Sequence, residues 1–404
     1  MSAKSFKVYF LFPLLLVIYE SAAYLSNDMY LPALPDVIRD LSTDEYGGKL
    51  TLTLWFVGSA CMQLILGPLS DKYGRKPILI ISGIVYVITN IVCAITGNIH
   101  LFLAMRVLQG MVVCAVIVAG YAAIHELLDS KRAIYTIALM GNITILAPAL
   151  GPVIGVGFIE LSSWRLIFWF IAALTVFSVG LLGFIMPESL DKTQAHKVNL
   201  KSLIPDYLSI IKNHKFLICT LIPCLNLSVI ITWLVAGPFI VEDIYHNTTY
   251  FAIYQLIIFS FYIAGTQAVK ILINKTGVEN TLNFGCGVIL FAGICGIVSE
   301  IFFKDSIYGL VIVLSIFGFG SALSFSSLQR LAVDSCKEPM GMRMAIFSLL
   351  ISIFCILGSL YAAKFYQGHL NFLFYLIIFA AFGANFLNKL RKNLFFPLKE
   401  KKCA

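Results

Sequence analysis

Long apolar stretches alternate with short polar segments along the whole sequence. A helix needs about 20 mostly apolar residues to cross a bilayer, and the sequence offers such a stretch repeatedly. The predicted spans are Val8–Ser26, Leu50–Leu66, Ile78–Ile95, Ile99–Ile124, Ile134–Phe158, Trp164–Ile185, Phe216–Val241, Phe251–Ile273, Leu282–Phe303, Ile307–Leu328, Met344–Ala363 and Leu370–Leu390. Because these stretches are unbroken and do not alternate in polarity, they argue against a β-barrel. The pattern predicts an all-α polytopic membrane protein with twelve transmembrane helices.

The longest polar interval, from Pro187 to Lys215, divides these helices into two groups of six. We therefore expect an N-terminal six-helix half over residues 1–187 and a cytoplasmic connector over residues 188–215. A C-terminal six-helix half over residues 216–404 would end in a short basic cytoplasmic tail. Two six-helix halves joined in this way are typical of transporters built from parallel repeats.

Composition narrows the class of protein. Of the 404 residues, 59% are hydrophobic and 12% are charged, whereas an ordinary soluble domain is about 25% charged. Too few polar groups remain to cover the surface of the protein in water, which excludes a soluble enzyme. The sequence contains no GxxxxGK[ST] loop, so we do not expect ATP as the energy source. It also contains no HExxH site and no GxSxG motif, so we expect no metal site and no catalytic residues.

The net charge of +8 raises the question of a nucleic-acid partner. If both termini are cytoplasmic, most Lys and Arg residues fall in cytoplasmic segments, as the positive-inside rule requires. The exceptions are Arg39, Lys49, Arg106, Arg165, Lys304 and Lys364. Because the positive charge is spread over many short loops and forms no single basic face, we expect the lipid bilayer as a partner and no nucleic acid.

Two carboxylates lie on the first predicted helix or its continuation, where charge is expensive. On a regular helix Glu20 and Asp28 are separated by about 80° around the axis and by roughly 12 Å along it, so both can face one cavity at two depths. A carboxyl group in a low dielectric favours its protonated form, which suits a proton-coupled carrier. Alternatively, Asp28 simply ends a helix near the outer surface, ahead of Pro32 and Pro35.

Arg106 lies a few residues into the fourth predicted span, where burial without a partner would be very costly. We expect it to pair with a carboxylate or with backbone carbonyl groups. As a fixed positive charge it would favour proton release from a nearby acid. A purely structural tie between helices is the alternative.

The fifth predicted span contains two glycines and two prolines at close spacing. Gly151 and Gly155 form a GxxxG pattern that permits close helix approach, while Pro148 and Pro152 remove backbone hydrogen bonds. The spacing alone leaves close packing and a moving hinge equally open.

Several motifs resemble those of the major facilitator superfamily. Gly67 to Pro77 is similar to its second-third loop signature, Arg106 to Gly110 to its fourth-helix signature, and Gly151, Pro152 and Gly155 to its antiporter signature. Within the superfamily, Tyr19-Glu20, Tyr24 to Met29 and Gly120 to Ile124 most resemble the MdfA-like members of the Bcr/CflA-type drug:proton antiporters. The stretch from Asp28 to Pro35 departs toward the broader Bcr/CflA pattern, so the sequence is intermediate.

This resemblance, which covers nearly the whole chain, implies proton-coupled export (antiport) of small lipophilic or cationic drugs across a bacterial inner membrane. Glu20, Asp28 and Arg106 would serve proton coupling and substrate binding. The substrate cavity would be lined by Tyr24, Asn27, Tyr121, Asn142, Trp233 and Gln255. The conformational motifs would be Gly67, Asp71, Gly74 and Arg75 in the loop and Pro148, Gly151, Pro152 and Gly155 in the fifth span. Of these, Asp71 and Arg75 would belong to a cytoplasmic charge cluster that locks one state. We expect no cofactor, the proton as coupling ion, and a monomer.

Two other functions stay open at this point. One is a dedicated carrier for one metabolite, such as a siderophore or an amino acid, with the same helices and a narrower pocket. The other, of a different class, is a non-transporting membrane receptor or scaffold, which would need no proton site.

Overall fold

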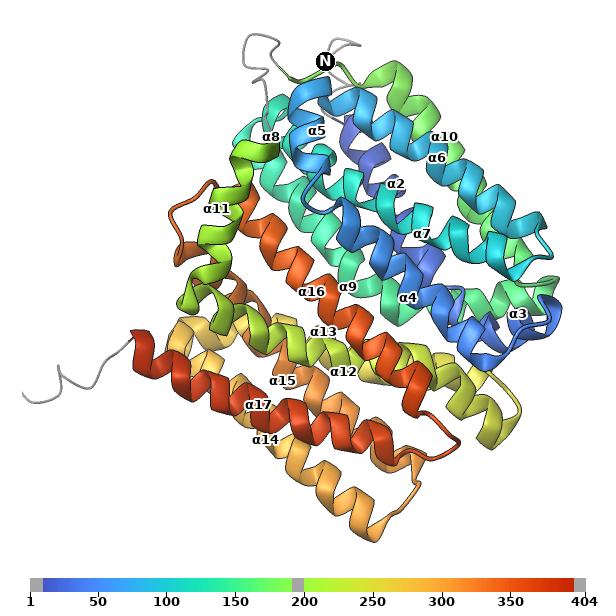
Figure 1. Cartoon of the computed structure of the whole chain (residues 1–404), viewed down its shortest axis with the longest axis vertical. Helices are drawn as coiled ribbons and strands as arrows, with labels where there is room; N and C mark the ends of the chain where they lie inside the picture. Colours follow the sequence, from blue (N-terminus) through green and yellow to red (C-terminus); the bar gives the residue numbers. More distant parts are fainter. Residues whose placement is uncertain (1–9, 191–199, 396–404) are drawn as a thin grey trace, which may run out of the picture. The chain divides into compact units, whose positions relative to one another are not determined.

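The computed structural model describes residues 10–190 and 200–395, and these ranges fold into helices without a strand (Figure 1). The chain divides into two compact units. The first comprises Met1–Ser202 with Tyr245–Ile253, and the second comprises Leu203–Ile244 with Tyr254–Ala404. The assignment of residues 188–215 as a cytoplasmic connector stays a prediction, and residues 191–199 of it and 396–404 of the basic tail lie outside the described residues.

The first unit contains the helices that correspond to the first six predicted spans, together with shorter pieces between them. Its elements are α2 (Phe12–Asp28), η2 (Leu31–Ala33), α3 (Leu34–Asp40), α4 (Glu45–Met62), α5 (Leu66–Tyr73), α6 (Arg75–Ile95), α7 (Ile99–Ala115), η3 (Val116–Gly120), α8 (Tyr121–Leu127), α9 (Ser130–Leu161) and α10 (Arg165–Ile185). Within this unit α2 packs against α9 and α10, α4 packs against α7, and α6 packs against α7 and α10.

The second unit contains the helices of the other six predicted spans, preceded by a shorter helix. Its elements are α11 (Leu200–Lys212), α12 (His214–Tyr245), α13 (Thr249–Thr276), α14 (Val278–Phe302), α15 (Ile307–Asp334), α16 (Met340–Phe365) and α17 (Asn371–Phe395). The first residues of α11 and a short segment around the start of α13 belong to the first unit. Helix α14 packs against α15 and α17.

Among the described residues, ten helices are long and apolar enough to cross a membrane, and the pair α4 and α5, bent by 52°, would make an eleventh span. Helix α2 matches the remaining predicted span and has 17 residues. The predicted twelve-helix membrane fold is therefore confirmed at the level of its helices.

Polar residues in the short loops begin several of these helices. The Asp44 side chain accepts a hydrogen bond from the backbone N–H of Gly47 at 2.8 Å and caps α4. Asn98 caps α7 in the same way through the backbone N–H of His100, also at 2.8 Å. These caps satisfy donors that a helix leaves unpaired at its start, so the polar interruptions before α4 and α7 also begin the helices that follow them.

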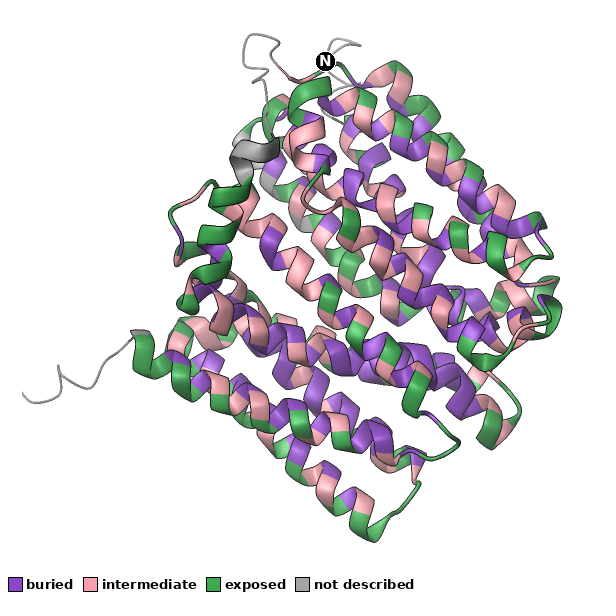
Figure 2. Ribbon diagram, viewed as in Figure 1, coloured by how far each residue is buried: buried purple, intermediate pink, exposed green. Residues whose placement is uncertain are grey.

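Figure 2 shows many exposed positions along the helices, and a large number of them are large hydrophobic residues. Phe184 is 89% exposed, Leu161 is 77% exposed and Phe302 is 73% exposed. A soluble monomer rarely exposes apolar patches on this scale, whereas lipid accepts them without cost. The distribution of exposed residues therefore indicates helices that face lipid.

Charged residues are distributed unequally along the spanning helices. In the described part of the second unit, each Asp, Glu, Lys and Arg of α12 to α17 lies within about two turns of a helix end. There, for example, the buried Arg391 of α17 donates to Glu279 in the first turn of α14 at 2.9 Å. The first unit places Glu20 in the middle of α2 and Arg106 in the middle of α7.

Two glycines allow α4 and α7 to approach until their backbones touch. A Cβ atom built on Gly110 of α7 would lie 1.9 Å from the carbonyl oxygen of Trp55, and one on Gly58 of α4 would lie 2.0 Å from the carbonyl oxygen of Val107. Both distances are far shorter than any van der Waals contact. Small residues at helix interfaces serve this purpose in membranes, where packing replaces the hydrophobic effect as the force between helices.

We expect Gly110→Ala to destabilise the protein, although alanine is the better helix former by about 1 kcal/mol. The added methyl group would overlap backbone atoms of α4, and overpacking of this kind costs about 1–3 kcal/mol. Thermal unfolding in detergent should show a lower Tm than that of the unmodified protein.

Gly180→Ala is the matched control, because Gly180 lies on α10 with nothing within 4 Å of its Cβ position. Its Tm should stay level or rise slightly. Equal Tm values for the two variants would mean that α4 and α7 are not in backbone contact.

Candidate functional site

Helix α2 carries both predicted carboxylates into the interior of the protein. It begins near Pro13, whose fixed φ angle suits the first turn of a helix, and ends at Asp28. Glu20 is 1% exposed and Asp28 is 4% exposed. Asp28 is therefore not an exposed helix end: the chain continues through the turn η2, which contains Pro32, into α3, which contains Pro35.

Tyr121 binds the Glu20 carboxyl group from a neighbouring helix. Its hydroxyl donates to Glu20 Oε1 at 3.3 Å, while Glu20 Oε2 is buried without a hydrogen-bond partner among the described residues. Tyr121 begins α8, directly after η3, a π-helical turn. Such turns shift the side chains that follow them around the helix and are frequent at functional sites. Glu20 thus has one partnered oxygen and one that a proton or cationic group could approach.

Arg106 is fully buried and donates hydrogen bonds to neutral oxygens from several helices. Its Nη2 donates to Asn27 Oδ1 at 2.7 Å, and its Nε donates to the backbone oxygen of Thr51 at 3.2 Å. Its Nη1 donates to Gln109 Oε1 at 2.9 Å, and its guanidinium carbon lies 5.1 Å from the centroid of the Tyr30 ring. Of the two expected kinds of partner, Arg106 uses a backbone carbonyl, supplemented by side-chain amides. Asn27 precedes Asp28, so the cation is tied to the end of α2 that carries the second acid.

The glycines of the fifth span hold α9 against that same end of α2. A Cβ atom on Gly151 would lie 2.6 Å from Cβ of Asp28, and one on Gly155 would lie 2.0 Å from the backbone oxygen of Met29. Pro148 and Pro152 lie inside the continuous helix α9. The structure thus shows close packing at this motif, and it places the motif directly on Asp28.

The residues expected to line a substrate cavity fall into separate groups. Asn27 bonds to Arg106 and Tyr121 bonds to Glu20, as described above, while Tyr24 is half-buried on α2 and Asn142 is exposed on α9. In the second unit Trp233 Nε1 donates to Gln255 Oε1 at 2.7 Å, and both side chains are fully buried. The pairings within each unit are thus defined, and the role of these residues as a cavity lining stays a prediction.

The loop motif forms a charge cluster at one end of the first unit. Arg75 bonds to Asp71 and Ser70, and its Nη2 donates to Glu126 Oε1 at 3.0 Å. Its backbone N–H also donates to Glu188 Oε1 at 2.9 Å.

Gly74 allows Glu188 to reach the start of α6. It has a positive φ of 103°, and a Cβ at this position would lie 2.4 Å from Glu188 Oε2. Gly67 has open space around it, with its nearest neighbour, Val118, at 4.0 Å.

Sequence reasoning missed three parts of these clusters. Glu126 and Glu188 each follow the apolar core of a predicted span by a few residues, and this placement at helix ends on the predicted cytoplasmic side is the signal that could have found them. The π-helical turn before Tyr121 has no comparable signal, because its residues, Val116 to Gly120, fit an ordinary apolar helix.

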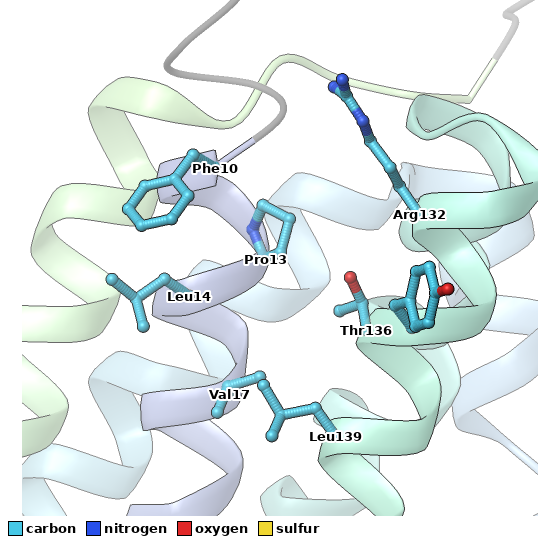
Figure 3. A pocket seen from close by; sticks show the side chains of 8 residues that line it. Phe10, Pro13, Leu14, Val17, Arg132, Thr136 and Leu139 are labelled. Atoms are coloured by element: carbon cyan, nitrogen blue, oxygen red, sulfur yellow. The ribbon is translucent and has the colours of Figure 1, made fainter.

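A separate open pocket of about 420 Å³ lies between α2 and α9 (Figure 3). It is lined by Phe10, Pro13, Leu14, Val17, Arg132, Tyr135, Thr136 and Leu139. Its walls are mostly apolar, and it includes none of the residues predicted for proton coupling or for the substrate cavity. The pocket is therefore distinct from the Glu20 and Arg106 clusters.

The curated proteins to which this chain is similar include multidrug transporters named MdfA. The chain is 30% identical to the multidrug transporter MdfA of Edwardsiella ictaluri (strain 93-146) over 350 residues, which cover 86% of this chain and 85% of the relative. It is 29% identical to the multidrug transporter MdfA of Yersinia pestis bv. Antiqua (strain Angola) over 345 residues, with 84% of each chain covered.

Solved structures of transporters share the fold at low sequence identity. A bacterial homolog to the human lysosomal transporter Spinster, in an inward-facing and occupied conformation, matches with a TM-score of 0.72 and 11% identity over the full length of both chains. The nucleoside transporter NupG matches with a TM-score of 0.68 and 16% identity, covering 95% of this chain and 99% of that one. The Major Facilitator Superfamily model matches residues 16–388, and the chain belongs to this family.

Proposed function

We propose that this protein is a secondary active transporter that exports small lipophilic or cationic drugs across a bacterial inner membrane in exchange for protons. Glu20 and Asp28 bind the proton and the substrate in competition, and Arg106 adjusts the balance between them. The proton is the coupling ion, and no cofactor takes part. The observation that carries the proposal is the Glu20 carboxyl, which is buried in the middle of α2 with one oxygen bonded to Tyr121 and the other unpartnered.

A buried carboxyl group of this kind has two stable ways to be neutral. It can hold a proton, or it can face a cationic substrate, since an isolated charge in a low dielectric is too costly to persist. Only one of the two fits at a time. Competition at a single carboxyl group is sufficient to exchange a proton for a substrate, because each ligand displaces the other.

Arg106 brings a permanent positive charge to the other end of α2. It is bound by neutral oxygens, so its charge is not cancelled by the groups that it touches. Asp28 follows Asn27, which accepts from Arg106. A cation held at this place favours the ionised form of a nearby acid and so promotes release of the proton.

The aromatic side chains near Glu20 suit the proposed class of substrate. Tyr121 lies against the carboxyl group, and Tyr24 lies one turn further along α2. Aromatic faces attract organic cations through the ring quadrupole and also accept flat neutral molecules. This combination favours lipophilic compounds, charged or neutral.

The relatives favour this reading over the alternatives. Both MdfA relatives are named as multidrug transporters, which favours transport over an enzyme, a receptor or a scaffold, and multidrug export over a carrier dedicated to one metabolite. The membrane-spanning helices and these bacterial relatives are consistent with a multi-pass protein of the inner membrane. Cytoplasmic placement of both termini, supported by the distribution of Lys and Arg, belongs to the same proposal.

Replacing the two acids should uncouple transport from protons. In everted vesicles energised to an acidic interior, addition of the lipophilic cation ethidium or of a neutral lipophilic drug should trigger proton release through the unmodified protein. Glu20→Gln and Asp28→Asn should each reduce this release by tenfold or more, because neither amide can exchange a proton at neutral pH.

Asp334→Asn is the matched control, because Asp334 is 61% exposed and pairs with Arg330 at a helix end. It should release protons as the unmodified protein does. Normal release from the double variant of Glu20 and Asp28, with the protein folded, would contradict the proposed mechanism; a response to neither compound by the unmodified protein would favour a dedicated carrier.

Arg106→Met should damage both stability and coupling. It leaves the side-chain oxygens of Asn27 and Gln109 without the donor that Arg106 supplies, and each unsatisfied group costs about 1–3 kcal/mol. Arg106→Lys keeps the positive charge, so it should retain more stability and more proton release than Arg106→Met. It should still fall below the unmodified protein, because an ammonium group cannot reproduce the hydrogen-bonding geometry of the planar guanidinium. Tm in detergent and substrate-triggered proton release measure the two effects; if both variants match the unmodified protein, Arg106 plays neither role.

A further inference from the structure

The pocket of Figure 3 is a groove along the first turns of α2 and α9, where these two helices are apart. Further along they touch, since a Cβ atom on Gly155 of α9 would lie only 2.0 Å from the backbone oxygen of Met29, just after α2. At their starts a volume of about 420 Å³ separates them instead. Helices in proteins pack closely, so a gap of this size between two spanning helices indicates room for another molecule.

The walls of the groove are largely apolar and are open to the outside of the protein. Phe10 and Leu14 on the side of α2 are 55% and 41% exposed, and Leu139 on α9 is 49% exposed. The hydrocarbon region of a bilayer contains no water that could fill such a groove, whereas a lipid chain packs well against apolar side chains. The part of the groove around Leu139 therefore fits an acyl chain.

The α9 wall of the groove presents its chemical groups in a definite order. Arg132 comes first, Thr136 follows one turn later and Leu139 about one turn after that. At 1.5 Å per residue the three span about 10 Å along the helix. In Figure 3 Thr136 projects toward α2, with its hydroxyl oxygen on the side of Arg132. A cation, a hydroxyl and an apolar side chain match a phospholipid taken from its phosphate through its ester groups to its acyl chain.

Thr136 indicates a ligand most directly. Its side chain is 8% exposed, and its hydroxyl forms no hydrogen bond with the described residues. Buried hydroxyl groups in native structures almost always have a partner, because an unpaired one costs free energy. A hydroxyl donates to a carbonyl oxygen, and the ester groups of a phospholipid supply such an oxygen at the border of the hydrocarbon region.

Arg132 supplies the charge that a phosphate group requires. Its Nε pairs with Asp129 Oδ1 at 3.4 Å, and 46% of its side chain is exposed. A guanidinium carries five N–H donors, so it can bind a phosphate beside that carboxylate. The apolar part of α9 that is long enough to cross a membrane begins at Tyr135. Arg132 therefore lies about one turn outside it, at the level of the headgroups.

We propose that this groove binds a phospholipid, with its phosphate on Arg132, an ester carbonyl oxygen on the Thr136 hydroxyl and an acyl chain between Leu14 and Leu139. The lipid joins the starts of α2 and α9, while glycines join the same two helices near Asp28. The site includes neither acid of α2, so it is independent of the proposed transport function.

Titration of the delipidated full-length protein with phosphatidylglycerol, followed by native mass spectrometry, tests the site. Leu139→Trp fills the groove and Arg132→Gln removes the cation, so each should raise the dissociation constant of the most tightly bound lipid about tenfold or more. Ile88→Trp and Arg330→Gln are matched controls, because Ile88 on α6 is 53% exposed and the side chain of Arg330 on α15 is 83% exposed. They should bind as the unmodified protein does, and Tm without lipid checks that each variant is folded.

Two lipid analogues separate the phosphate contact from the ester contact. Diacylglycerol lacks the phosphate, so the unmodified protein should bind it about tenfold more weakly than phosphatidylglycerol, and Arg132→Gln should not weaken its binding further. Ether-linked phosphatidylglycerol lacks the ester carbonyl oxygens. The unmodified protein should bind it several-fold more weakly than the ester form, and Thr136→Val should remove this difference.

Three results would contradict the proposal. Tight binding that Leu139→Trp leaves unchanged would place the lipid outside the groove. Equal weakening of phosphatidylglycerol and diacylglycerol by Arg132→Gln would show that Arg132 does not bind the phosphate. Equal binding of the ester and ether lipids by the unmodified protein would exclude the hydrogen bond from Thr136.

Discussion

A guanidinium group is stable inside a protein only when its N–H groups are hydrogen-bonded, and Arg106 is fully buried. The oxygens that meet this requirement come from α2, α4 and α7 itself. These helices must therefore keep one arrangement, and the glycine contacts between α4 and α7 provide the close approach that lets the Thr51 carbonyl reach the guanidinium. In the same way Gly151 and Gly155 bring α9 against Asp28 and Met29. Small residues and one buried cation thus determine where the end of α2 that carries Asp28 lies.

Most of the helical fold could be predicted from the sequence, because apolar stretches of membrane length are a strong signal. The position of Glu20 within an apolar stretch indicated a buried carboxyl group, and it is buried, whereas the sequence left open whether Asp28 lies inside or ends a helix near the surface. Their partners could not be predicted. Tyr121 meets Glu20 only because a π-helical turn shifts the helix just before it, and Glu188 meets the start of α6 only because Gly74 has a positive φ. These contacts join segments that are far apart in the sequence, and they depend on local backbone conformation. The periodicity of apolar residues gives no information about either.

In both units a charged residue near the end of the last long helix binds the start of an earlier helix, but the residue is an acid in the first unit and a base in the second. In the first unit Glu188 follows α10 and receives the backbone N–H groups of Arg75 and Lys76 at the start of α6. In the second unit the acid is Glu279 at the start of α14, and Arg391 of α17 is its partner. Both α6 and α14 follow a glycine with positive φ, Gly74 at 103° and Gly277 at 85°. In each unit, therefore, the helix that follows a glycine with positive φ begins against a charged residue from the end of that unit, and the acid and the base exchange places between the two units.

The absence of charge from the middle of the described spans of the second unit has an evolutionary consequence. A substitution there, such as at the Trp233 and Gln255 pair, exchanges one neutral group for another and risks about one hydrogen bond of stability. A substitution at Glu20 or Arg106 changes the buried charge of the first unit and therefore the free energy of folding of the protein. Substitutions between neutral residues can therefore accumulate in one half of the gene while the other half stays under stricter constraint.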